Sequence, residues 1–175
     1  YGLYLGNRLD APIARWWLQP PIRSTEDRNA AYREILETVL RRHGVGRVVV
    51  SSLVGHALDA LDTGWPTVQV LHDYYPAWPL LGIHPGPYLR DGERADLDAA
   101  LADHELLPAL GDLDADGWAA IADRWRDTVA RRDVRLAAPS RSVVELLERI
   151  DPGWAGRDIR IIPHGLPDFP GDEAV

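Results

Sequence analysis

The chain contains no cysteine, no lysine and no methionine. Without cysteine it has no disulfides, no thiolate nucleophile and no zinc site built on cysteine ligands. Without lysine it has no Schiff-base chemistry, and all 19 of its basic residues are arginine. Arginine keeps its charge at any physiological pH and suits phosphate and carboxylate groups. These absences exclude several classes of covalent catalysis and leave anion recognition open.

Two other features are missing, and both bear on where the protein acts. No apolar run approaches the ~20 residues of a membrane span, and no secretory signal opens the chain. The formal net charge is -8, which argues against a nucleic-acid partner because phosphate recognition needs a basic face. The sequence therefore predicts a soluble, cytoplasmic protein that does not bind nucleic acid.

A length of 175 residues allows one domain to bury about 70% of the surface of its unfolded chain. The first residues, YGLYLG, resemble a strand already under way, and the last, GLPDFPGDEAV, have the composition of a linker. We expect residues 1–165 to form one domain that is truncated at its start. Residues 166–175 are expected to lead to a second domain.

Apolar runs bounded by turn residues predict five strands. The run Val48 to Val50 is β-branched and continuous, as in a parallel strand buried on both faces. The expected strands are Gly2–Leu5, Arg47–Leu53, Thr67–His72, Val134–Ser140 and Ile159–Gly165.

Helical patterns separate these strands. Ser24 or Thr25 is expected to cap a helix that ends at Gly44. A short helix is expected from Gly55 to Leu61, two helical stretches at 93–110 and 116–132, and a last helix with a capping box from Ser142 to Glu145. Alternating strands and helices predict an α/β fold with a doubly wound, mainly parallel, Rossmann-like sheet, in which residues 93–132 form a helical insert.

The strongest candidate site follows the strand Thr67–His72. His72 and Asp73 come directly after the buried strand, and ligands of open α/β sheets bind beyond the carboxyl ends of the strands. His72 could donate to a ligand oxygen, and Asp73 could orient the imidazole or accept from a hydroxyl. In the alternative interpretation, both side chains only bond the neighbouring backbone of the loop.

Four segments, in this order, carry a resemblance to a known family: VVVSSLVGHALDAL, PTVQVLHDYYPAWP, LAAPSRSVVELLERI and IRIIPHGL. Together they resemble the amino-terminal domain of a family 4 glycosyltransferase, a retaining enzyme of the GT-B architecture with two facing Rossmann-like domains. The resemblance covers residues 46–167. Trp78 stands where the family often has cysteine, and the glycine-rich loop of the family's first strand is not found.

The resemblance implies a function and a set of site residues. This domain would form one half of a GT-B fold and line the acceptor side of the cleft, with His72 and Asp73 as catalytic residues. The parent enzyme would move a sugar from a nucleotide-sugar donor to a carbohydrate or lipid-linked acceptor, without a further cofactor or a metal. Peripheral contact of the parent with a membrane stays open. The donor would be bound mainly by the second domain, so the isolated chain is expected to be inactive. The expected substrate-binding residues are Ser52, Gly55, Tyr74, Tyr75, Trp78, Ser140, His164 and Gly165.

Most of these residues also have a purely structural interpretation. The turn at Ser52 and Gly55 could hold an anion through free amides or simply cap a helix, and for Ser140 the cap is favoured. The aromatic residues could form a platform for a sugar or pack the loop. His164 and Gly165 are expected to mark the hinge to the second domain.

Three other functions are alternatives to the glycosyltransferase. A non-catalytic Rossmann-like interaction domain would use the helical insert as its binding surface. A metal phosphohydrolase of the HD type is disfavoured because the histidines lack helical spacing. A dehydrogenase is disfavoured because no G-x-G-x-x-G follows a strand.

Overall fold

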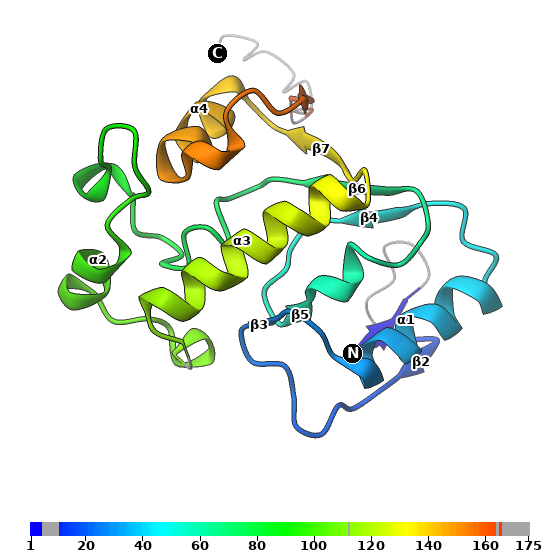
Figure 1. Cartoon of the computed structure of the whole chain (residues 1–175). Helices are drawn as coiled ribbons and strands as arrows, with labels where there is room; N and C mark the ends of the chain where they lie inside the picture. The colour runs from blue at the N-terminus through cyan, green and yellow to red at the C-terminus, as the bar shows by residue number, and fades with distance from the viewer. Residues whose placement is uncertain (5–10, 112, 164, 166–175) are drawn as a thin grey trace, which may run out of the picture.

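The computed structural model describes residues 1–4, 11–111, 113–163 and 165. Its main sheet has four strands in the order of the chain: β4 (Val48–Val50), β6 (Thr67–Val70), β7 (Arg135–Ala138) and β8 (Ile159–Ile161). Every neighbouring pair is parallel. The prediction of an α/β fold with a mainly parallel, Rossmann-like sheet is confirmed at this level, and four of the five expected strands form the sheet (Figure 1).

The first expected strand lies elsewhere. β1 (Gly2–Leu3) pairs antiparallel with β2 (Ala14–Arg15), apart from the main sheet. A second small pair joins β3 (Thr25–Glu26) and β5 (His56–Ala57) in parallel. β5 and the single 3-10 turn Leu58–Ala60 replace the short helix that was expected from Gly55.

Helix α1 (Ala30–Arg42) begins four or five residues later than expected. Asn29 is its N-cap, and its side chain accepts a hydrogen bond from the amide of Tyr32 at 2.9 Å. The prediction that Ser24 or Thr25 caps this helix is wrong, because Thr25 lies in β3 and its buried hydroxyl donates to the carbonyl of Leu53. The end of the helix is as expected, since Gly44 follows it in the left-handed region, with φ at 58°.

Helix α3 (Ala115–Arg131) connects β6 to β7 and runs across the sheet (Figure 1). Its Trp118 and Trp125 are fully buried, and the indole Nε1 of Trp125 donates to Gln69 Oε1 of β6 at 2.8 Å. The shorter α2 (Leu97–Asp103) lies beyond the amino end of α3 and contributes to a second, smaller apolar cluster with Trp78. α3 therefore belongs to the central core of the domain.

Helix α4 (Arg141–Ile150) follows β7 directly. Its N-cap is Ser140, whose Oγ accepts from the amide of Val143 at 3.4 Å. The capping box predicted from Ser142 to Glu145 is therefore wrong, because the helix has already begun at Arg141.

The strand β4 lies at an edge of the sheet. Val49, its middle residue, is 64% exposed, so the prediction of a strand buried on both faces is wrong for β4. Val50, its neighbour, is buried, because successive side chains of a strand point to opposite faces of the sheet. Among the described residues, no helix has both the length and the hydrophobicity that a membrane span needs.

Candidate functional site

The parallel strands bring three of the candidate segments to one edge. The register pairs Val50 with Gln69 and Val70 with Ala137. Ser51 and Ser52 follow β4, His72 and Asp73 follow β6, and Ser140 follows β7. Since neighbouring strands lie about 4.8 Å apart, these segments lie side by side where the strands end. This end of the sheet, with Ser51, His72 and Ser140, is its carboxyl edge.

His72 and Asp73 are both exposed at this edge. The Oδ1 atom of Asp73 accepts a hydrogen bond from the amide of Tyr75 at 3.0 Å. This is the local turn that the alternative interpretation predicts for Asp73, in which the side chain bonds the backbone of its own loop. The turn fixes the direction of the carboxylate. A carboxylate has lone pairs for several donors, so the turn and an external ligand are compatible.

Tyr75 and Trp78 lie inside the loop rather than on it. Tyr75 is 3% exposed and Trp78 is 2% exposed. The hydroxyl of Tyr75 bonds the hydroxyl of Thr25, which itself donates to the carbonyl of Leu53. Because threonine has a single hydroxyl proton, Tyr75 is the donor in this pair. The burial of Tyr75 raises its pKa to about 12. Their positions favour packing of the loop over contact with a ligand.

A hollow of about 250 Å³ lies next to Asp73. Tyr74, which is half-buried, and His84 contribute polar groups to it, and the rest of its wall is mainly apolar, with Trp78, Leu80, Leu81, Gly82, Ile83 and Pro85. Burial, and after it the charge of Asp73, raises the pKa of Tyr74. Tyr74 thus presents a neutral hydroxyl and an aromatic ring at a small, largely apolar site.

The turn after β4 uses its own amides. The amide of Val54 donates to Ser52 Oγ at 3.2 Å, that of Gly55 to the carbonyl of Ser24 at 2.7 Å, and that of His56 to the carbonyl of Leu53 at 3.0 Å. Gly55 takes a φ of 73°, which explains glycine there. Because these three amides are satisfied within the protein, they are not available to an anion.

Two further residues at this edge were missed by the sequence reasoning. The hydroxyl of Tyr32, from α1, lies 2.7 Å from Nδ1 of His56, and both line a hollow of about 240 Å³ with Ser51 and Ser52. Burial lowers the pKa of His56. The pair joins segments 24 residues apart, and no local pattern in either segment signals it.

The remaining candidates are placed as follows. Ser140 is the helix cap already described, and its Oγ lies 2.8 Å from that of Ser142. His164 lies outside the described residues. Gly165 is exposed, and a Cβ added to it would meet no atom within 4 Å. Among the described side chains, no group of three or more histidines and carboxylates could hold a metal ion.

Comparison of the chain with protein-family models, with curated proteins and with solved structures gave no match. The fold and the geometry of the carboxyl edge are therefore the basis for any statement about function.

Proposed function

We propose that this chain is the acceptor-side domain of a retaining glycosyltransferase of the two-domain GT-B type. The supporting observation is the exposed pair His72 and Asp73 at the carboxyl end of β6, flanked by the ends of β4 and β7. These ends carry the segments that resemble the family, in the same order along the chain. The second, nucleotide-binding domain would face this edge across a cleft.

The chemistry asks little of the protein beyond placement and electrostatics. In the transfer the anomeric carbon of the sugar forms a bond to the acceptor oxygen and its bond to the nucleoside diphosphate breaks, so groups that stabilise the departing charge accelerate the reaction. The imidazole of His72 would donate a hydrogen bond to an oxygen of the nucleotide-sugar. Asp73, held by the Tyr75 amide, would accept a hydrogen bond from the hydroxyl that receives the sugar. The hollow beside Tyr74 would receive the apolar face of a carbohydrate or lipid-linked acceptor.

The decisive experiment measures sugar transfer in the polypeptide that joins this chain to a nucleotide-binding domain, over a panel of sugar nucleotides. We expect His72→Asn and Asp73→Asn each to lower kcat/KM by about a hundredfold, as for a lost acid–base or orienting group. Asp73→Asn keeps an acceptor for the Tyr75 amide, so it removes the charge without removing the turn. His43→Asn is the matched control, because His43 is exposed at the far end of α1.

Unchanged sugar transfer in both variants would contradict the assignment of His72 and Asp73 to the site. Absence of transfer from every sugar nucleotide would contradict the glycosyltransferase proposal. Calorimetry on the chain alone provides a second test. The proposal expects acceptor sugars to bind and sugar nucleotides to bind weakly, and tight nucleotide binding at the carboxyl edge contradicts the assignment of the two sides.

A further inference from the structure

A cavity of about 600 Å³ lies at the amino edge of the sheet, opposite the candidate site. It is formed where α3 ends and where β4, β6 and β7 begin. Its volume falls in the range of small-molecule sites, about 300–1,000 Å³. Arginine dominates its polar lining, with Arg47, Arg131, Arg132 and Arg135 against a single aspartate, Asp133, among the described lining residues.

The sheet register directs two of these arginines to the same face. Val49 pairs with Val68, and Val68 pairs with Arg135. Paired residues of neighbouring parallel strands share a face, as do residues two apart in one strand, so Arg47, two residues before Val49, is on the same face as Arg135, with β6 between them. Their backbones are two strand spacings apart across the sheet and two residues apart along the strands, which together give roughly 12 Å. Within the described part of the chain, neither forms an ion pair.

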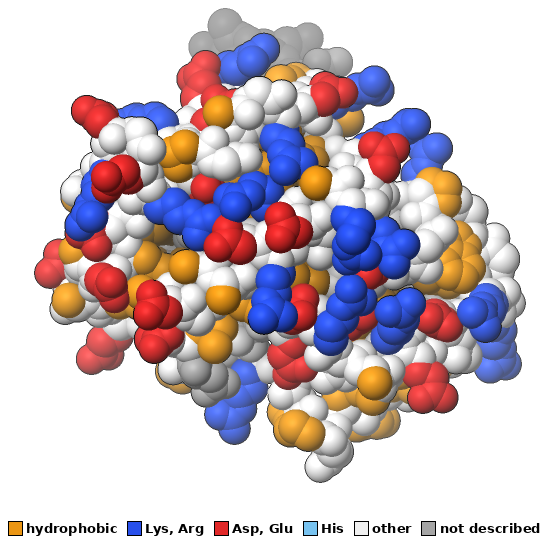
Figure 2. Space-filling model, in the orientation of Figure 1, with side chains coloured by type: hydrophobic (Ala, Val, Ile, Leu, Met, Phe, Trp, Pro, Cys, Tyr) orange, Lys and Arg blue, Asp and Glu red, His pale blue; other side chains and the backbone are white. Residues whose placement is uncertain are grey.

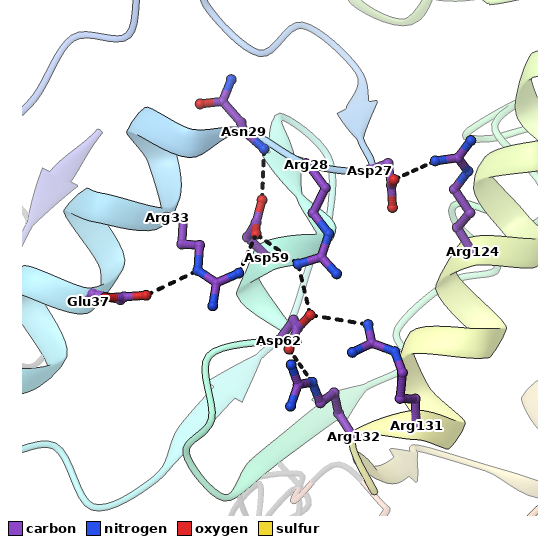
Figure 3. A network of polar contacts seen from close by, with 10 residues as sticks. All are labelled: Asp27, Arg28, Asn29, Arg33, Glu37, Asp59, Asp62, Arg124, Arg131 and Arg132. Carbon is purple, nitrogen blue, oxygen red and sulfur yellow. Dashed lines mark hydrogen bonds and ion pairs between the residues drawn. The ribbon is translucent and has the colours of Figure 1, made fainter.

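The other two arginines are held from behind. The carboxylate of Asp62 is 1% exposed and pairs with Arg131 at 3.1 Å and with the Nε of Arg132. Arg28 joins it at 2.8 Å, and Figure 3 shows the three guanidinium groups converging on Asp62. Both Arg131 and Arg132 remain almost half exposed. Asp62 therefore orders them at the rim of the cavity and leaves part of each guanidinium for a ligand.

We propose that this cavity binds a small phosphorylated molecule. Four guanidinium groups on a chain of net charge -8 concentrate positive charge where the rest of the protein repels anions. The planar guanidinium matches phosphate oxygens bidentately. Trp65, half-buried in the wall, gives the organic part of the ligand an aromatic surface. A cavity of this size has room for a small molecule.

Ribose 5-phosphate and pyrophosphate are the probes, and ribose is the uncharged counterpart of the first. Titration followed by calorimetry and by backbone amide NMR is expected to show saturable binding of both anions. The shifts should concentrate at Gly64, Thr67 and Arg135, which belong to the cavity. Ribose should not bind.

Arg47→Gln and Arg135→Gln are expected to weaken binding by tenfold or more each, the order of magnitude of a lost charged hydrogen bond. Arg160→Gln is the matched control. Arg160 pairs with Ala137, so it lies on the same face as Arg135, but it does not line the cavity. Absence of saturable binding overturns the proposal, and so does equal weakening in all three variants, which would indicate diffuse charge.

This inference is independent of the glycosyltransferase proposal. The carboxyl-edge changes His72→Asn and Asp73→Asn should leave pyrophosphate binding unchanged, and the amino-edge changes should leave acceptor binding unchanged. Sugar nucleotides are best titrated against the chain that carries both Arg47→Gln and Arg135→Gln. Binding that remains in this variant concerns the carboxyl edge, so each proposal is tested separately.

Discussion

Two buried aspartates, Asp59 and Asp62, each contact three other residues (Figure 3). Asp59 accepts a hydrogen bond from the backbone amide of Asn29 at 2.8 Å and contacts Arg28 at 3.3 Å. Asp62 pairs with Arg28, Arg131 and Arg132. Burial by itself would raise the pKa of Asp62, but the hydrogen bonds from Arg131, Arg28 and Arg132 outweigh it and lower the pKa. The two carboxylates join the start of α1 to the end of α3.

Replacing the carboxylate of Asp62 should lower the stability of the fold. We expect Asp62→Asn to lower the free energy of unfolding by about 2 kcal/mol at pH 7, in the range for hydrogen bonds to charged groups. Because the folded pKa is depressed, the contribution of Asp62 is complete above its unfolded value of about 3.9 and is lost as the pH falls through the folded pKa.

Urea unfolding of the two proteins at pH 7 and at successively lower pH measures this difference, which should shrink below about pH 4. Asp133→Asn is the control. Asp133 is exposed, with φ at 49°, a conformation that asparagine tolerates, so this change should stay within about 0.5 kcal/mol. A difference independent of pH would contradict the ionic origin of the effect.

At the scale of elements, α3 determines how the sheet is covered. Acidic and arginine side chains alternate across the face that carries α3 (Figure 2), while its inner face buries Trp118 and Trp125. Trp125 packs on Trp154 with ring centroids 4.2 Å apart, and its indole N–H is the polar link to β6. Trp154, also fully buried, has no hydrogen-bond partner for its own Nε1 in the described part of the chain.

The two tryptophans form a matched pair for measuring that link. Both Trp125→Phe and Trp154→Phe remove ring volume from the core, but only the first leaves Gln69 Oε1 without its donor. We expect Trp125→Phe to cost about 1 kcal/mol more than Trp154→Phe, the net value of a buried hydrogen bond. Denaturant unfolding with a common m-value gives both numbers. Equal costs would mean that Gln69 does not depend on the helix.

At the scale of the whole molecule, the two edges of the sheet differ in charge. The carboxyl edge presents histidines, tyrosines and serines, and the amino edge presents arginines. The two proposed sites therefore differ in their response to pH. In the described lining of the amino-edge cavity there is no histidine or tyrosine, and the chain has no lysine.

Binding at the amino edge should consequently follow the ionisation of the ligand alone. Arginine stays charged from about pH 6 to 10, and the lowered pKa of Asp62, which its arginine partners cause, keeps that carboxylate ionised. The affinity for ribose 5-phosphate is expected to be constant from about pH 7.5 to 10 and to fall below the second pKa of the phosphate, near 6. Calorimetry across this range is the measurement. A decline between pH 8 and 10 would place a titrating protein group in the site.

Local patterns in the sequence were sufficient for part of the fold. The β-branched and apolar runs at 48–50, 67–70, 135–138 and 159–161 predict strands because side-chain shape and burial act over a few residues. The end of α1 was predicted for a similar reason, since Gly44 takes a backbone conformation that few other residues adopt. The alternation of these strands with helices then implies parallel pairing, and with it a common edge for Ser51, His72 and Ser140.

The tertiary structure decided the rest, because it depends on partners distant in the chain. Thr25 is a sound helix cap by its local sequence, but its hydroxyl bonds Leu53 and Tyr75, so α1 begins at Ala30. The pairing of Tyr32 with His56 and the gathering of arginines around Asp62 join segments that no local pattern connects. The sequence alone determined which residues lie at the carboxyl ends of the strands. Only packing decided that Tyr75 and Trp78 are buried and that a basic cavity opens at the opposite edge, since burial is settled by contacts between distant elements.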